Sequence, residues 1–221
     1  MTPFRQALLL TLALSAAPAF AHDDDTSKVN GSIHAEAGRS YGDLSTVNGG
    51  IDIDAAATTG SASTVNGGIE VGDRARTGGL ETVNGGIRLG REVQVDGGLE
   101  AVNGSLFADR GSRIREDVEN VNGGIGLVDT DVGGGIRTVR GDITVGVGSH
   151  VKGGLRVEKP NGGFHLGKQR PPRIVIGPDA VVEGAMVFEH PVVLYVHKTA
   201  KTGPVSGATA KTFDTPTAPK D

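Results

Sequence analysis

Aliphatic and polar residues alternate in short runs that recur along most of the chain. Two of these runs are Ile51-Asp52-Ile53 and Ile69-Glu70-Val71, in which one charged residue separates two aliphatic residues. A period of two is typical of a β-strand with one buried and one exposed face. Because glycine interrupts these runs after a few residues, they are too short for helices. The pattern therefore predicts many short strands.

A longer repeat organises these strands. The unit reads L-x-T-V-N-G-G-I-x-V, as in residues 80–89, and its Asn-Gly corner returns every 18 or 19 residues before a later insertion. An aliphatic landmark lies four residues before most corners: Leu44, Ala62, Leu80, Leu99, Val118 and Ile136. The corner asparagines are Asn30, Asn48, Asn66, Asn84, Asn103, Asn122 and, after the insertion, Asn161, while Arg140-Gly141 replaces the corner between the last two.

One such unit cannot fold alone. Its four or five aliphatic residues contribute roughly 1.5–3 kcal/mol each on burial, whereas every ordered residue costs about 1–2 kcal/mol of backbone entropy. The balance becomes favourable only when units stack and each strand hydrogen-bonds to its copies in the neighbouring units. The sequence therefore predicts an all-β, single-stranded β-solenoid of about eight coils between Val29 and Leu166.

The Asn-Gly corner has a structural interpretation. Glycine suits backbone with positive φ, and asparagine tolerates such conformations better than other residues. Asparagines stacked at the strand spacing of roughly 4.8 Å can also pass amide hydrogen bonds from coil to coil. We therefore expect the seven corner asparagines to form a ladder that supports the stack.

Composition changes divide the chain into five segments. Residues 1–21 read as a signal peptide, 22–28 as a loose acidic segment and 29–167 as the solenoid. Residues 168–198 lose the Asn-Gly corner and gain proline and larger apolar residues, which predicts irregular coils that cap the stack. Residues 199–221 are rich in Thr, Ala, Lys and Pro and predict a flexible tail.

The first segment predicts export. Arg5 precedes the apolar run 7–17, and Ala19-Phe20-Ala21 matches an A-x-A cleavage site, so we expect cleavage after Ala21. Removal of one Arg from 22 Lys and Arg leaves 21 against 26 acids, or a net charge of −5. The mature chain carries no apolar run long enough for a membrane span. We expect a periplasmic or secreted protein, in which the lack of Cys excludes disulfides.

The repeated V-N-G-[GDS]-I corners behind a signal peptide resemble bacterial adhesin-like β-solenoid domains of uncharacterised function. The segment 174–184, IVIGPDAVVEG, resembles the coils of bactofilins, which are polymer-forming cytoskeletal proteins. The resemblance implies a right-handed, roughly three-sided β-helix without an enzyme site and with self-association through its ends. The export signal departs from the cytoplasmic bactofilins and argues against a cytoskeletal role.

One column of acids is the candidate binding site. If the coils are in register, Glu81, Glu100 and Glu119 lie in one outward column, after Ser45 and Ser63 and before Arg137. Like charges directly opposite one another on neighbouring strands are destabilising. The column therefore either binds cations weakly or stays hydrated, and the second alternative is favoured. The G-x-G-x-D offset of calcium-binding β-rolls is absent.

Other chemistry has little support in the sequence. A second column is formed by Asp52, Glu70 and Arg88, with an exposed Glu70–Arg88 ion pair expected. The acids are scattered one per coil, aromatic residues make up 4% of the chain, and the six His residues match no metal-ligand spacing. A chain without a basic stripe also gives no indication of nucleic-acid binding.

The sequence predicts a non-enzymatic structural or adhesive element of the cell envelope that needs no cofactor. Its expected partners are its own copies or an envelope or glycan surface. A polysaccharide-active β-helix enzyme, a lyase or a hydrolase, is the alternative. The surface decides between them: a deep groove lined by at least three charged residues favours the enzyme, and flat ladders favour the structural role.

Overall fold

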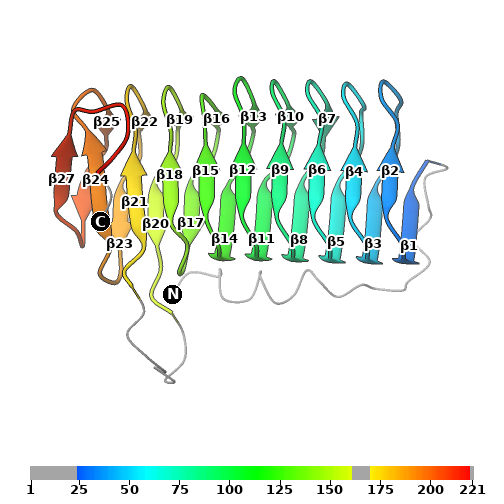
Figure 1. The fold of residues 1–221 in the computed structure, drawn as a ribbon, viewed down its shortest axis with the longest axis horizontal. Coiled ribbons are helices and arrows are strands. Elements are labelled where there is room, and N and C mark those ends of the chain that lie inside the picture. The colour runs from blue at the N-terminus through cyan, green and yellow to red at the C-terminus, as the bar shows by residue number, and fades with distance from the viewer. Residues whose placement is uncertain (1–23, 161–169, 220–221) are drawn as a thin grey trace.

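The computed structural model describes residues 24–160 and 170–219, and in this part the chain is all-β with no helix. The strands form three parallel sheets; each coil adds one strand to two of them, and most coils also add one to the third (Figure 1). The result is a β-solenoid of about nine turns with coils of about 19 residues. The predicted fold is confirmed, while its right-handed sense stays a prediction.

Two of the sheets, which we call A and B, run the length of the molecule. Sheet A consists of β1 (Thr26–Asn30), β3 (Leu44–Asn48), β5 (Ala62–Asn66), β8 (Leu80–Asn84), β11 (Leu99–Asn103), β14 (Val118–Asn122), β17 (Ile136–Thr138), β20 (Leu155–Val157), β23 (Met186–Phe188) and β26 (Val205–Ser206). Sheet B consists of β2 (Ile33–Ala35), β4 (Ile51–Ile53), β6 (Ile69–Val71), β9 (Ile87–Leu89), β12 (Leu106–Ala108), β15 (Ile125–Leu127), β18 (Ile143–Val145), β21 (Arg173–Ile176), β24 (Val193–His197) and β27 (Ala210–Phe213).

The third side of the solenoid, sheet C, has shorter strands. It consists of β7 (Arg76–Thr77), β10 (Gln94–Val95), β13 (Arg113–Ile114), β16 (Asp131–Val132), β19 (His150–Val151), β22 (Val181–Val182) and β25 (Lys201–Thr202). The first coils reach this side only through isolated bridges at Ser40, Thr58 and Arg76. Three sheets make the solenoid three-sided, as the resemblance implies.

The core consists of continuous columns of aliphatic side chains. The landmark residue of each repeat is buried on sheet A, and the corner isoleucine and the second residue after it are buried on sheet B, as at Ile87 and Leu89. Parallel pairing keeps these columns in register, since Leu80 pairs with Leu99 and Ile87 with Leu106. Small aliphatic side chains suit this core because the three sheets enclose a narrow interior.

A buried threonine column lies beside the landmark column on sheet A. In three coils the hydroxyl donates to the corner glycine carbonyl of the preceding coil, as Thr64 Oγ1 does to Gly49 O at 2.8 Å and Thr82 Oγ1 to Gly67 O at 2.9 Å. At Asn120 the larger amide donates to Gly104 O at 2.8 Å, and its Oδ1 is the one buried side-chain polar atom without a partner in the described part of the chain. The interior polar groups therefore tie neighbouring coils together.

The stack begins earlier and ends later than the sequence predicts. Residues 22–28 are expected to be loose, but the strand β1 begins at Thr26, whose amide donates to Asp43 O at 2.8 Å. Residues 199–221 are expected to be a flexible tail, but they contain β25, β26 and β27. Phe213 is buried against Tyr195 and His197, with ring centroids 6.4 and 5.0 Å apart respectively, and this packing explains why the last residues are ordered.

The predicted cap, residues 168–198, is built from regular coils as far as it is described. Ile174 pairs with Ile143 and Met186 pairs with Leu155, so the register continues beyond the insertion. These extra coils explain why about nine turns replace the expected eight. The predicted signal peptide, 1–21, lies outside the described residues. No helix in the described segments has the length and hydropathy of a membrane span.

Candidate functional site

The acidic column exists as predicted on the outer face of sheet A. Parallel pairing places Glu81 opposite Glu100 and Glu100 opposite Glu119. The same column begins with serines and continues after the acids with arginines, in the order Ser27, Ser45, Ser63, Glu81, Glu100, Glu119, Arg137, Arg156, Val187 and Ser206. Three carboxylates therefore follow one another at the spacing of neighbouring strands.

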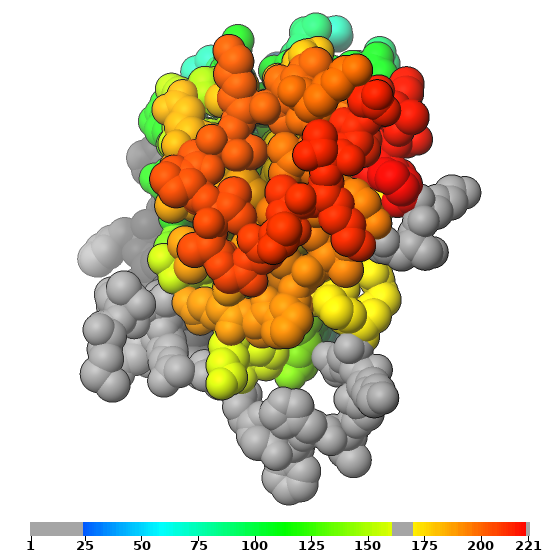
Figure 2. Space-filling model, turned by 90° about the vertical axis from the view of Figure 1, so that its left-hand side faces the viewer, coloured from blue at the N-terminus to red at the C-terminus, as the bar shows by residue number. Residues whose placement is uncertain are grey.

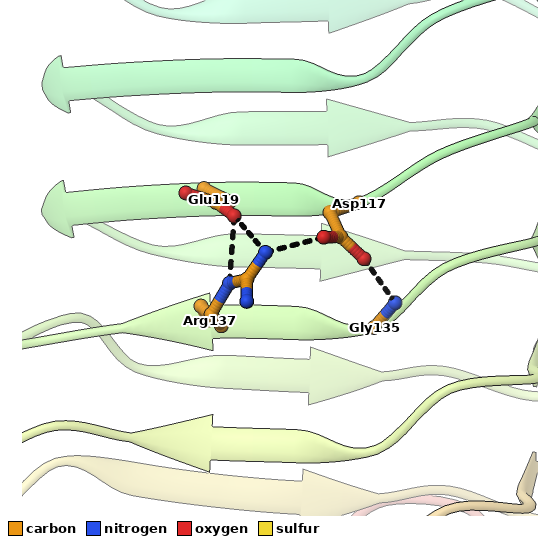
Figure 3. Close-up of polar contacts among 4 residues, drawn as sticks. All are labelled: Asp117, Glu119, Gly135 and Arg137. Atoms are coloured by element: carbon orange, nitrogen blue, oxygen red, sulfur yellow. Dashed lines mark hydrogen bonds and ion pairs between the residues drawn. The ribbon is translucent and has the colours of Figure 1, made fainter. Parts of the chain in front are cut away.

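Arginine neutralises one end of the acidic column. The Arg137 Nε donates to Glu119 Oε1 at 2.6 Å, and its terminal nitrogen contacts the carboxylates of both Glu119 and Asp117 (Figure 3). Asp117 is held in place because its other oxygen accepts a hydrogen bond from Gly135 N at 2.6 Å. Glu119 is only 9% exposed, so this ion pair is partly desolvated. Glu119 and Arg137 are one repeat of 18 residues apart, so the sequence indicates this ion pair. The sequence does not indicate the contact of Arg137 with Asp117.

Glu100, in the middle of the acidic column, forms no ion pair with an arginine among the described residues. Burial between stacked strands, together with the charges of Glu81 and Glu119, raises the pKa of Glu100 to about 7. Burial also raises the pKa of Glu81 above its ordinary value. For Glu119, burial raises the pKa and Arg137 opposes that shift. Near neutral pH the column therefore holds its protons more tightly than free glutamates do.

The column does not form a metal centre. In the described part of the chain no group of three or more His, Cys, Asp or Glu side chains is arranged to hold a metal ion. Carboxylates stacked along a line face the same way, whereas Ca²⁺ takes six to eight oxygens that surround it. The geometry gives no support to the cation alternative and is compatible with a hydrated, partly protonated column.

The asparagine ladder is present along the corner between sheets A and B. Each amide donates to the carbonyl oxygen of the asparagine one coil earlier, with Nδ2–Oδ1 distances between 2.9 and 3.1 Å. The ladder runs through Asn30, Asn48, Asn66, Asn84, Asn103 and Asn122. Asn161 lies outside the described residues. The predicted ladder is confirmed for the six described members.

The conformational reason given for this corner holds only in part: the corner glycines Gly31, Gly104 and Gly123 have positive φ, whereas the asparagines do not. None of the six described asparagines has positive φ; the described non-glycine residues that do are in turns elsewhere, such as Arg74 and Glu92. The glycine after each asparagine is needed chiefly because stacked backbones approach closely. A Cβ on Gly67 would collide with the carbonyl oxygen of Gly49, and one on Gly85 would collide with that of Gly67. The corner is therefore defined by contact between coils.

We expect Asn84→Val to lower the free energy of unfolding by about 1–2 kcal/mol. Asn84 donates to Asn66 at 3.0 Å and accepts from Asn103 at 3.1 Å, and valine removes both hydrogen bonds. The ladder is exposed, so water replaces part of this loss. Urea unfolding of both proteins measures the difference, and Asn30→Val, which removes one ladder bond only, is the control. Equal stability of the Asn84 variant and the wild type would contradict a stabilising ladder.

The second predicted column lies on the outer face of sheet B. Asp52 pairs with Glu70 and Glu70 pairs with Arg88, as expected. In the described part of the chain, however, the Arg88 guanidinium forms no ion pair with Glu70. It lies over the ring of Phe107, 5.3 Å from the ring centroid. Phe107 has room for this contact because the next residue of the column is Gly126. The expected ion pair is replaced by a cation–π contact.

The hollows on the described surface are open to solvent, and most of them carry charged residues of both signs, whereas the one beside the acidic column carries acids only. On sheet C, Arg115 pairs with Asp96 at 2.7 Å and Arg113 with Asp131 at 3.4 Å around one such hollow. A smaller hollow beside the acidic column is lined by four acids, Glu81, Asp96, Glu100 and Glu116, together with several glycines. Neither is a deep groove of the kind that the enzyme alternative requires.

Comparison with known proteins adds no relative. No family model matches the chain, and neither the curated proteins nor the solved structures give a match. The class that the structure itself defines is a parallel, three-sided β-solenoid repeat protein.

Proposed function

We propose that this protein is an exported, non-enzymatic β-solenoid that serves as a structural or adhesive element of the bacterial cell envelope, similar in role to the adhesin-like solenoids it resembles. One observation carries the proposal: outward side chains stand one per coil in flat, straight ladders. Ladders of this kind present a repeated surface, whereas catalysis requires unlike groups that converge on one point.

The stack suits a mechanical role. About nine coils share one continuous core, and ladders of asparagine and threonine hydrogen bonds join neighbouring coils. Coupling between nearest neighbours makes a repeat protein of this kind a stiff, elongated element. A stiff element that carries repeated side chains can meet a surface at several points at once, which strengthens weak individual contacts.

The proposal is tested by binding to isolated envelope. The purified protein should co-sediment saturably with envelope fragments and release no soluble sugar. Two variants identify the face that binds. Val83→Lys changes the outer face of sheet A, and Thr144→Lys changes the outer face of sheet B. Failure of the wild type and of both variants to co-sediment would contradict an adhesive role.

Export makes a separate prediction. The protein recovered from the periplasm or the medium should begin at His22, because a signal peptidase cleaves after the A-x-A sequence that ends at Ala21. N-terminal sequencing or intact-mass measurement checks this start. Substitution of Ala21 by a bulky residue should leave the precursor uncleaved, whereas the same change at Ala17 is the control. Recovery of the full-length chain only from the cytoplasm would contradict export.

The enzyme alternative rests on Glu81 and Glu100. These residues pair on adjacent strands at a spacing of roughly 4.8 Å, close to the separation of the two carboxylates in retaining glycosidases, and Glu100 has a pKa of about 7. Release of reducing ends from envelope polysaccharide by the wild type, lost in both Glu81→Gln and Glu100→Gln, would favour a hydrolase. No release by the wild type would leave the structural role.

A further inference from the structure

The valine of each repeat is a feature that the proposed function leaves unexplained. In the strand pattern L-x-T-V-N the first and third residues face the core, so valine faces outward beside the Ser/Glu column. These outward valines are partly exposed, and the first, Val29, is 66% exposed. They form an apolar line across sheet A, which we call the valine stripe: Val29, Val47, Val65, Val83, Val102 and Val121.

The column beside the valine stripe is divided into two halves. The first three coils carry Ser27, Ser45 and Ser63, and the next three carry Glu81, Glu100 and Glu119. Hydroxyl groups can donate to carboxylates, whereas two carboxylates repel each other. A surface with donors in one half and acceptors in the other is complementary to itself when one copy is reversed.

The N-terminal end of the stack is poorly suited to joining two copies. At the N-terminal end Lys28 occupies the position that buried threonine holds in the next coils, and its Nζ donates to Ser32 O at 2.7 Å. A lysine at this position blunts a strand edge. At the other end the last described residues lie to one side of the final coil (Figure 2), where Ala218 packs against Tyr195 and the Pro219 carbonyl accepts from Arg173 on the outer face of sheet B. Besides the ends, the outer face of sheet A offers a surface for self-association.

We propose that two copies associate face to face and antiparallel through the first six strands of sheet A. A two-fold axis parallel to the strands places β1 opposite β14, β3 opposite β11 and β5 opposite β8 of the second copy. Every valine of the stripe then meets a valine. Two carboxylates then meet serines of the second copy, Glu81 with Ser63 and Glu100 with Ser45, while Glu119, which Arg137 already binds, lies opposite Ser27.

The size of this face sets the strength of the association. Six strands spaced at about 4.8 Å, with two outward columns each, present roughly 400 Å² per copy, or about 800 Å² in total. This area lies below the roughly 1,200–2,000 Å² of stable interfaces. The dimer is therefore weak in dilute solution, and it forms where the protein is concentrated, as in an envelope compartment. The inference rests on the proposed function, because only a non-catalytic face is free to be covered.

Sedimentation equilibrium of the purified protein from micromolar to millimolar concentration tests the inference. The weight-average mass of the wild type should rise toward twice the monomer value. Val83→Lys, at the centre of the stripe, should remain monomeric. Val147→Lys is the matched control, because Val147 is a 50% exposed valine outside sheet A, and it should associate as the wild type does. Circular dichroism melts check that each variant is folded.

A charge exchange tests the antiparallel register. Ser45→Glu places a new carboxylate opposite Glu100 of the second copy, twice in each dimer, and should weaken association at least tenfold. The double variant Ser45→Glu/Glu100→Ser again places a carboxylate opposite a hydroxyl, and it should recover most of the lost dimer affinity. A wild type that stays monomeric, a Val83→Lys variant that still associates, or a double variant as weak as Ser45→Glu would each overturn the dimer. None of these results affects the envelope-binding test.

Discussion

Gly85→Ala should lower the free energy of unfolding by at least about 3 kcal/mol, a large loss for one added methyl group. The methyl group would collide with the carbonyl oxygen of Gly67 and lie against Gly68 N, which are backbone atoms of the coil below. Backbone cannot move aside as a flexible side chain does, so the two coils must separate. Separation breaks the neighbouring bonds of the asparagine ladder and the hydrogen bond from Thr82 to Gly67.

Gly79→Ala is the matched control for this prediction. A Cβ on Gly79 would lie 3.8 Å from its nearest neighbour, Gly98 O, which is an ordinary van der Waals distance. Both glycines belong to the same coil, so loss of glycine flexibility in the unfolded chain affects the two variants alike. Urea unfolding followed by circular dichroism should separate them by more than about 2 kcal/mol. Equal loss in both variants would mean that close approach of the coils does not explain the corner glycine.

Glu100→Gln should stabilise the protein above pH 7 and have little effect below about pH 4.5. The pKa of Glu100 is raised to about 7 from its ordinary value of 4.5, so the folded protein binds this proton more tightly than the unfolded chain does. Below the lower value the carboxyl is protonated in both states and costs nothing. Between the two values stability falls as pH rises, and above pH 7 the whole penalty is present.

Above pH 7, Glu100→Gln should raise the free energy of unfolding by about 1–2 kcal/mol. This figure allows for solvent screening, because Glu100 is only partly buried. Free energies of unfolding of the wild type and Glu100→Gln at about pH 5 and about pH 8 measure it. Glu70→Gln, the same change at an exposed position on sheet B, is the control. A gain from Glu100→Gln that is larger at pH 5 than at pH 8 would contradict the raised pKa.

The acidic column shows which contacts the repeat spacing predicts and which it does not. Glu81, Glu100 and Glu119 are one repeat apart, and parallel pairing without bulges preserves that spacing in space. The contact of Arg137 with Asp117 depends on side-chain conformation across two coils, which repeat spacing does not specify. Side-chain conformation also decides that Arg88 contacts the Phe107 ring and not Glu70. The ring fills space left by Gly126, which repeat spacing does not specify.

The sequence by itself determined the solenoid, its buried aliphatic columns and the asparagine ladder. A strict period of 18 or 19 residues admits few arrangements, since each unit can bury its apolar residues only against its copies. Only the tertiary structure decided why the corner is glycine and where the stack ends. The first depends on the approach of one backbone to the next, as at Gly85 and Gly67. The second depends on the burial of Phe213 against Tyr195, two aromatic residues that the Asn-Gly repeat does not contain.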